Sequence, residues 1–488
     1  MNTSIIRYLL GCVLKIEAVL MLLPFLVGIL YGEHEAFAYL ITFALCGILG
    51  ILLTIKKMKS TIFYLKEGCL ATSLSWIVLS VFGCLPFLLT GEIPKFHDAL
   101  FETISGFTTT GASILNEVES LSHCTLFWRS FTHWIGGMGV LVFLLAIIPL
   151  SGGSNINLMR AESPGPSVGK LVPKIRYTAR LLYAIYLILT ITQIVFLLLG
   201  KMPLFDALTT TFGTAGTGGF GIKNNSIAGY SPYIQWVVTI FMVLFGVNFN
   251  AYYFVFIREF KKVFSIEEVR CYFLILLCST LIIFLNILQT GMNAADCLRH
   301  AAFQTSSIMT STGFATADFN LWPEASKSIL VLLMFIGACA GSTGGGIKVS
   351  RILIMIKTLF KELHSYIHPK SIMKVKMDGK PVEHEVVRAI NVYFISFLFL
   401  FTLSVLAISF EGHDLVTNFT AVIATLNNIG PGLELVGPTG NFGFFSVASK
   451  YILMFDMLAG RLELFPLFIL FHPNLWIEMI HSKRKVHE

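Results

Sequence analysis

The stretch Phe96-His-Asp-Ala-Leu-Phe-Glu-Thr-Ile-Ser-Gly-Phe-Thr-Thr-Thr-Gly-Ala-Ser113 joins a moderately apolar segment to a Thr/Gly-rich one. The same plan recurs at residues 205–220, and two further copies end in Thr310-Ser-Thr-Gly-Phe314 and Asn427-Asn-Ile-Gly-Pro-Gly432. We align the four copies on glycines that are 107, 95 and 117 residues apart, namely Gly111, Gly218, Gly313 and Gly430. Each copy lies between two long apolar runs, so the repeating unit is span, re-entrant loop, span.

The composition excludes a single soluble domain, because 55% of the 488 residues are hydrophobic and 13% are charged, against about 25% in ordinary soluble domains. Ten apolar runs approach the roughly 20 residues that cross a bilayer, at 8–30, 36–55, 68–90, 125–150, 179–200, 233–257, 271–290, 328–357, 387–410 and 446–471. The sequence therefore predicts an all-α polytopic membrane protein with ten transmembrane helices. It divides into an N-terminal hairpin (1–60) and four pseudo-fourfold helix–pore loop–helix repeats (61–150, 151–265, 266–365 and 366–488).

Basic residues predict the orientation of the chain. The segments on one side hold 26 Lys and Arg, while the loops on the other hold six. Because basic residues are enriched on the cytoplasmic side, both termini should be cytoplasmic, in the inner membrane of a bacterium. The first apolar run is read as a permanent helix and not as a signal peptide. The net charge of +7 comes from short clusters between spans, which argues against nucleic-acid binding.

A re-entrant loop leaves backbone N–H and C=O groups unpaired at membrane depth, which is tolerated only where protein buries them or water reaches them. Each copy could form a half-helix, such as Asp98 to Thr109, whose negative C-terminal end favours a cation. The Thr/Gly-rich segment after it could then present carbonyls that replace the water shell of the ion. Loops of small residues could also be plain helix contacts, but four evenly spaced copies favour an ion path.

Several motifs resemble the Trk/Ktr/HKT superfamily of potassium transporters, and within it the bacterial TrkH-type potassium uptake proteins. Besides the four loop segments, they are Trp134-Ile-Gly-Gly-Met-Gly139, Arg160-Ala-Glu-Ser-Pro-Gly165, Gly341-Ser-Thr-Gly-Gly-Gly346 and Gly460-Arg-Leu-Glu463. The resemblance implies a filter that binds potassium through Thr109, Thr110, Gly111, Gly216, Thr217, Gly218, Ser311, Thr312, Gly313, Asn428, Ile429 and Gly430. Gly111 favours potassium over sodium, but the residues after the four glycines differ, so we expect only moderate selectivity.

Two further features are expected below the filter. The run from Gly337 to Gly346 should interrupt its helix, since each interior glycine costs about 1 kcal/mol. The resemblance makes this run an intramembrane gating loop, with gate residues Gly341, Ser342, Thr343, Gly344, Gly345 and Gly346; a close-packed helix contact is the alternative. Arg461 should face a water-filled cavity, because a lone charge in a span costs about 2.5–3.5 kcal/mol or more. By resemblance it is a positive barrier to cations, which could pair with Glu463 or Asp456.

The remaining expectations concern partners and chemistry. We find no catalytic constellation and no cofactor motif, so the chain is not expected to be an enzyme. The resemblance implies a homodimer and a cytoplasmic nucleotide-binding ring of TrkA type, docked on residues 357–388 and 151–180; membrane lipid could bind the same basic stretch. An ion-coupled symporter, driven by protons or sodium, is the main rival to a passive path. His133 could titrate or pack beside Trp134, and a Cys124–Cys297 pairing stays open.

Overall fold

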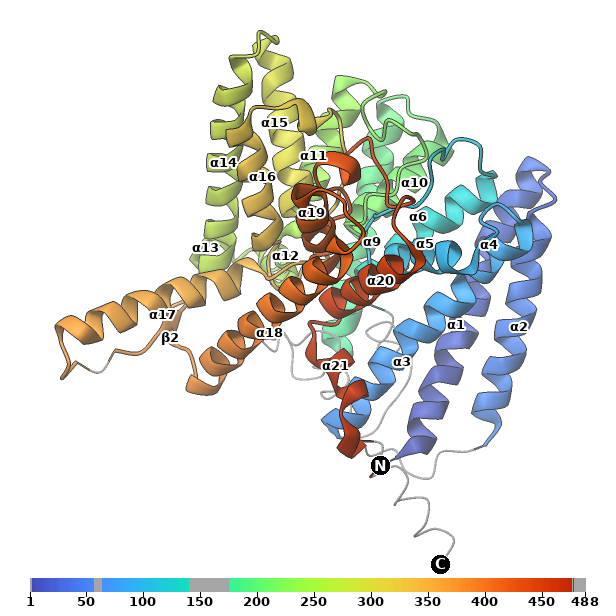
Figure 1. Ribbon diagram of the computed structural model, residues 1–488, viewed down its shortest axis with the longest axis horizontal. Coiled ribbons are helices and arrows are strands. Elements are labelled where there is room, and N and C mark those ends of the chain that lie inside the picture. Colours follow the sequence, from blue (N-terminus) through green and yellow to red (C-terminus); the bar gives the residue numbers. More distant parts are fainter. Residues whose placement is uncertain (1, 57–63, 140–174, 372, 476, 478–488) are drawn as a thin grey trace, which may run out of the picture.

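The computed structural model describes residues 2–56, 64–139, 175–371, 373–475 and 477. Helices make up nearly all of the regular structure in these ranges (Figure 1). A small antiparallel hairpin, β1 (Lys376–Met377) with β2 (Lys380–Pro381), pairs Lys376 with Pro381. The end of the predicted 125–150 span and most of the predicted docking segment 151–180 lie outside the described residues. Apart from this hairpin, the part of the chain that the structure describes is mostly helical, as the sequence predicts.

Six helices within these ranges are long and apolar enough to cross a membrane. They match six of the ten predicted spans and are α1 (Thr3–Tyr31), α2 (Ala36–Ile55), α3 (Leu65–Gly83) continued by α4 (Leu85–Thr90), α9 (Ile175–Leu199), α14 (Glu267–Leu288) and α18 (His384–Ser409). Large apolar side chains such as Leu277, Ile395 and Phe399 are about two-thirds exposed on them. Such faces suit contact with lipid, in which apolar exposure carries no penalty.

The other four predicted spans contain shorter helices of 13 to 15 residues: α6 (His123–Gly137), α11 (Pro232–Gly246), α16 (Glu324–Ile336) and α20 (Val447–Arg461). At 1.5 Å per residue such a helix covers about 20–23 Å, less than the roughly 30 Å of the bilayer core. The prediction of one continuous helix was wrong for two of these spans. Residues 233–257 form α11 and α12 (Phe249–Phe256), bent by 94°, and 446–471 are interrupted after α20.

Glycines explain where these short helices end, since each stops at or beside one. A Cβ on Gly136 would lie 1.8 Å from the carbonyl oxygen of Phe107, and a Cβ on Gly460 would lie 1.9 Å from that of Leu426. The ends of α6 and α20 therefore lie directly against backbone carbonyls of other segments, an approach that a side chain would block. The remaining elements are α13 (Phe260–Ser265), α17 (Val349–Ile367), α21 (Phe465–Phe468), η1 (Phe319–Leu321), η2 (Glu434–Val436) and η3 (Ile469–Phe471).

The first two helices pack side by side at one edge of the molecule, and α17 and α18 extend from the opposite edge (Figure 1). The helix α1 also packs against α3 and α6, so the N-terminal hairpin covers the first repeat. All nine cysteines lie in described ranges and are free, so Cys124 and Cys297 are not paired. Four more helices of 12 to 16 residues lead to the site.

Candidate functional site

Four half-helices form where the sequence predicts them: α5 (Phe96–Phe107), α10 (Leu204–Ala215), α15 (Ala294–Met309) and α19 (Leu415–Leu426). An aspartate lies in the first turn or at the N-cap of each, at positions 98, 206, 296 and 414. A carboxylate there complements the positive end of the helix dipole. The free carbonyls at the other end then carry the partial negative charge, directly before the Thr/Gly-rich segments.

The four segments that follow share one unusual backbone. The second residue after each half-helix has a positive φ of 53–57°, at Thr109, Thr217, Ser311 and Asn428. Two residues later a glycine has a φ of 77–97°, at Gly111, Gly219, Gly313 and Gly430. Between these two positions, the amide of the middle residue donates to the carbonyl five residues earlier, at 2.8–2.9 Å. These left-handed angles are costly for residues other than glycine. All four segments share them, so the segments are equivalent in conformation as well as in sequence.

This conformation corrects the alignment of the second copy. The residue equivalent to Gly111 is Gly219, whereas the sequence analysis aligned Gly218. Asp206 then precedes its glycine by 13 residues, as Asp98 precedes Gly111. The error arose because two glycines are adjacent in this copy and only one of them has a positive φ. The segment equivalent to residues 109–111 is therefore 217–219, and Gly216 lies one residue before it.

The four segments also close into a ring. Each glycine faces the carbonyl oxygen of the residue just before the equivalent glycine in the next segment. A Cβ added at Gly111 would lie 1.9 Å from the carbonyl oxygen of Gly218, and one added at Gly219 would lie 2.0 Å from that of Thr312. The same distance is 2.1 Å from Gly313 to the oxygen of Ile429 and 2.7 Å from Gly430 to the oxygen of Thr110. The order runs from the first copy to the fourth and back to the first. Backbone oxygens of the middle residues are thus held around one axis.

Buried polar side chains support this ring. His133 Nδ1 lies 2.7 Å from the carbonyl oxygen of Gly106, and His133 Nε2 accepts a hydrogen bond from the amide of Phe220 at 3.2 Å. The imidazole of His133 is therefore neutral, with its proton on Nδ1. His133 therefore bridges the first two copies. The amide of Asn428 donates to Thr110 Oγ1 at 2.9 Å and so bridges the fourth copy and the first. The sequence analysis weighed titration or packing for His133 and missed this bridge.

A buried ion pair joins α6 to α5, the half-helix of the first copy. Arg129 on α6 donates to Glu102 on α5 from Nη2 at 2.6 Å and Nε at 2.9 Å, with side chains 2% and 0% exposed. Arg129 also donates to the carbonyl of Gly221 at 3.2 Å and lies 4.1 Å from the ring centre of Phe220. The pair therefore also connects the first two copies. The sequence placed Arg129 within a span, which was a signal that it needs a buried partner.

The predicted interruption at Gly337–Gly346 is confirmed, because α16 ends at Ile336 and α17 begins at Val349. We call residues 337–348 the crossing loop. The amide of Gly345 donates to Ser311 Oγ at 2.6 Å, and a Cβ on Gly345 would lie 2.6 Å from the carbonyl oxygen of Asn427. The crossing loop therefore lies directly against the third and fourth ring segments, at the end where their half-helices stop.

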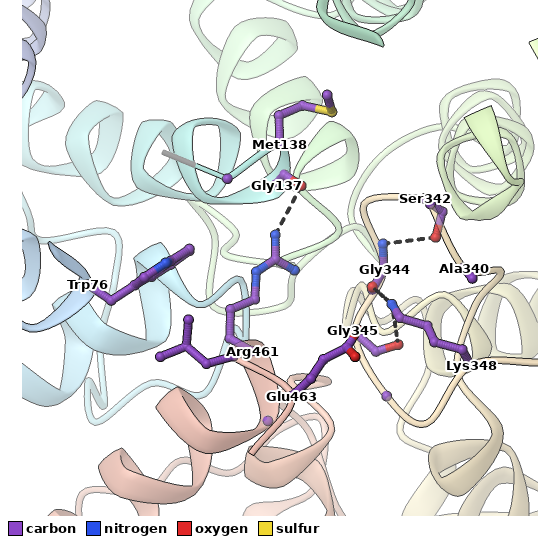
Figure 2. A pocket seen from close by; sticks show the side chains of 15 residues that line it. Trp76, Gly137, Met138, Ala340, Ser342, Gly344, Gly345, Lys348, Arg461 and Glu463 are labelled. Atoms are coloured by element: carbon purple, nitrogen blue, oxygen red, sulfur yellow. Dashed lines mark hydrogen bonds between the residues drawn. The ribbon is translucent and has the colours of Figure 1, made fainter. Parts of the chain in front are cut away.

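Two positively charged side chains line a cavity of about 110 Å³ beside this loop (Figure 2). Arg461, the last residue of α20, donates to the carbonyls of Thr343 at 3.1 Å and Gly137 at 3.0 Å, and also to that of Gly136. Lys348 is buried and donates to the carbonyls of Gly345, at 3.2 Å, and Gly344. Lys348 was not among the predicted gate residues, which end at Gly346.

Both carboxylates that the sequence analysis considered as partners of Arg461 bond to other residues. Glu463 accepts from Arg351 at the start of α17, and Asp456 accepts from Ser404 at 2.8 Å. Arg461 contacts the crossing loop and the end of α6 through carbonyl oxygens. Its guanidinium therefore ties these two segments together while it lines the cavity, as expected from a charge at this depth.

The ring segments contain backbone carbonyl and hydroxyl oxygens, which suit hard cations. Among the described residues, no three His, Cys, Asp or Glu side chains gather as they would around a transition metal. His364 on α17 and His368, which follows the last residue of that helix, have ring centroids 4.8 Å apart. Chemically, the site can strip and replace the hydration shell of a cation.

Comparisons with known proteins agree with this geometry. Residues 35–478 match the sequence model of the TrkH family, described as cation transport proteins. The Trk system potassium uptake protein TrkH of Salmonella typhimurium is 36% identical, over 98% of this chain and all of that protein. TrkG of Escherichia coli K12, from the same system, is 34% identical with the same coverage.

A solved structure extends the likeness to the fold. The crystal structure of the potassium transporter TrkH from Vibrio parahaemolyticus superposes with a TM-score of 0.88, at 33% identity over 98% of this chain and all of that one. These relatives are transporters and not enzymes. The chain therefore belongs to the TrkH family of cation transport proteins.

Proposed function

We propose that this chain takes up potassium across the bacterial cytoplasmic membrane, through the ring of four segments as a selectivity filter. The observation that carries the proposal is the closed set of contacts between each glycine and the next middle carbonyl. A single-file cation path needs oxygens fixed around one axis, and a glycine at each junction lets the segments approach closely enough to fix them. The names of the relatives, Trk system potassium uptake proteins, support potassium as the ion.

The filter would hold potassium at the oxygens of three residues from each copy: Thr109, Thr110 and Gly111; Thr217, Gly218 and Gly219; Ser311, Thr312 and Gly313; and Asn428, Ile429 and Gly430. With the corrected register, the residues after the four glycines are Ala112, Phe220, Phe314 and Pro431. They share no chemistry that would extend the set of oxygens. We therefore infer a short filter that discriminates moderately against sodium.

The crossing loop would serve as the gate. It lies beneath the third and fourth filter segments, and its carbonyls are held by Arg461 and Lys348. Two positive charges beside the path oppose the entry of a cation, since water screens them less in a narrow cavity than in bulk. Opening would require the loop to leave its contacts with Ser311 and Arg461.

The orientation, organisation and partners are also proposals. The charge distribution supports an inner-membrane protein with both termini cytoplasmic, a hairpin at 1–60 and four pore repeats with the boundaries given above. The relatives' Trk system name supports a regulatory partner; we propose a TrkA-type nucleotide-binding ring on the basic stretch 357–388, and a homodimer. Anionic lipid is the competing ligand for that stretch.

A specific observation favours coupled symport as a second candidate. Glu17 lies fully buried in α1, and neither of its carboxylate oxygens has a hydrogen-bond partner. An intramembrane carboxyl of this kind is a default candidate for ion or proton coupling.

Purified protein in liposomes tests both functions, with potassium, rubidium and sodium fluxes measured side by side. A preference for sodium would refute the filter proposal. Unitary currents that reverse at the potassium equilibrium potential would establish a passive path. A fixed ratio of protons or sodium to potassium would establish symport instead.

A further inference from the structure

The crossing loop is rich in glycine. Five of the residues from 337 to 346 are glycines, and three of these have a positive φ. Glycine-rich backbone has more conformational freedom to lose than any other. The two ends of the loop meet, because the amide of Val349 donates to the carbonyl of Ala338 at 3.1 Å. A loop of this kind needs an external group to fix it in one place.

Glu268, in the first turn of α14, supplies such a group. Its Oε1 accepts the amide of Ala340 at 2.6 Å and that of Ser350 at 3.1 Å, and the residue is 4% exposed. One carboxylate oxygen therefore joins the entry of the crossing loop to the first turn of α17. The amide of Ser350 is one of the helix N-terminal donors that lack an intrahelical partner, and bonds to a carboxylate are roughly twice as strong as neutral ones.

The second oxygen of Glu268 extends this clamp to another element. Its Oε2 accepts from Asn248 Nδ2 at 3.3 Å, and Asn248 caps α12 at the 94° break after α11. On either side of Asn248 the crossing loop bonds to the same break. The amide of Phe249 donates to the carbonyl of Gly341 at 3.0 Å, and the amide of Cys339 donates to that of Gly246 at 3.1 Å.

We propose that Glu268 is the positioning residue of the gate, whose carboxylate holds the crossing loop closed beneath the filter. This inference rests on the proposed role of the crossing loop as the gate. Opening requires the bonds from Ala340 and Ser350 to break, because both ends of the loop share one acceptor. Lys348, at the end of the loop, bonds to its middle (Figure 2), and Arg461 bonds to Thr343. Glu268 instead bonds to Ala340 near the start of the loop and to Ser350 just after its end.

The test compares Glu268→Ala, which removes the acceptor, with Glu268→Gln, whose amide oxygen can still accept both backbone amides. Glu267→Gln, on the neighbouring carboxylate, is the matched control because Glu267 bonds to Lys357 and not to the crossing loop. The full-length chain is reconstituted without a regulatory partner, and basal potassium flux is measured. In parallel, mass spectrometry of the Cys339 peptide follows its modification by N-ethylmaleimide, with buried Cys124 as the internal reference.

We expect Glu268→Ala to raise both basal flux and Cys339 modification about tenfold, the effect of losing about one charge-assisted hydrogen bond. Glu268→Gln keeps the acceptor but not its charge, so its effect should be clearly smaller than that of Glu268→Ala. Glu267→Gln should stay within about twofold of the parent protein, and a mere loss of folding would not produce this order. If Glu268→Ala does not elute as a monodisperse peak, Glu268→Asp replaces it, since the shorter side chain cannot reach both amides.

Each remaining outcome decides between the proposals. Unchanged Cys339 modification in Glu268→Ala would overturn the clamp. Equal effects of Glu268→Gln and Glu268→Ala would also overturn it, because charge and not position would then matter. Increased Cys339 modification without increased flux would uphold the clamp and refute the crossing loop as the gate.

Discussion

Replacing Gly111 by alanine tests the ring most directly. The φ of Gly111 is +78°, which costs about 1–2 kcal/mol for a residue with a side chain. The new Cβ would lie 1.9 Å from the carbonyl oxygen of Gly218, whereas real Cβ atoms essentially never come closer than 3.0 Å to another atom. The carbonyl or the segment must therefore move by at least 1.1 Å. A misplacement of about 1 Å at a positioned site can cost about 100-fold in rate.

We expect Gly111→Ala to lower potassium flux in liposomes by about ten- to 100-fold, with a matching loss of preference over sodium. Gly91→Ala is the control, because Gly91 has almost the same φ, +76°, but nothing within 4 Å of its added Cβ. Both variants carry the same backbone strain, so the difference between them reports the ring contact alone. Equal fluxes in the two variants would refute the ring as the element that fixes the filter.

Three further predictions concern charged groups. Arg461→Ala should raise basal potassium flux in liposomes, because it removes a positively charged side chain from the cavity and frees the crossing loop. Unchanged flux would mean that Arg461 has only a structural role. Glu102→Gln should lower the unfolding free energy in micelles by about 3–5 kcal/mol, because it strands the buried charge of Arg129; the double variant with Arg129→Gln should recover part of that loss. Burial alone would raise the pKa of Glu33, but hydrogen bonds from His123 and Cys124 outweigh it and lower the pKa below 4.5. The stability from Glu33 is therefore complete above pH 4.5 and is lost as pH falls through the lowered pKa; thermal stability measured at pH 7 and pH 4 should show this drop, and Glu33→Gln should reduce it.

Much of the architecture could be predicted from sequence periodicity. Six long apolar runs form helices, and the half-helices lie where the repeat places them. The glycine run at 337–346 interrupts its helix as expected, because the cost of interior glycines is local. The α11–α12 bend was missed because Gly246 and Asn248 are single residues within a long apolar run, and the bend also depends on hydrogen bonds with the distant crossing loop.

Supporting residues of the site were harder to find. His133 and Glu268 look ordinary in the sequence, since the partners of His133 lie 27 and 87 residues away and those of Glu268 lie 20, 72 and 82 residues away. Arg129 lies within the predicted span 125–150, but nothing in the sequence identifies Glu102 as its partner from among the other acids. The register of the second copy was ambiguous because Gly218 and Gly219 are adjacent.

By itself, the sequence determined the class of protein, the number of loop copies and the glycines available to them, because apolar length and glycine content act on the local backbone. Only the tertiary structure decided which glycine of each copy faces the next carbonyl and which buried acid holds the crossing loop. Those choices depend on atoms brought together from segments up to 320 residues apart, such as Thr110 and Gly430. The physical reason is that close backbone approach and the pairing of buried charges are properties of the packed molecule and not of any one segment.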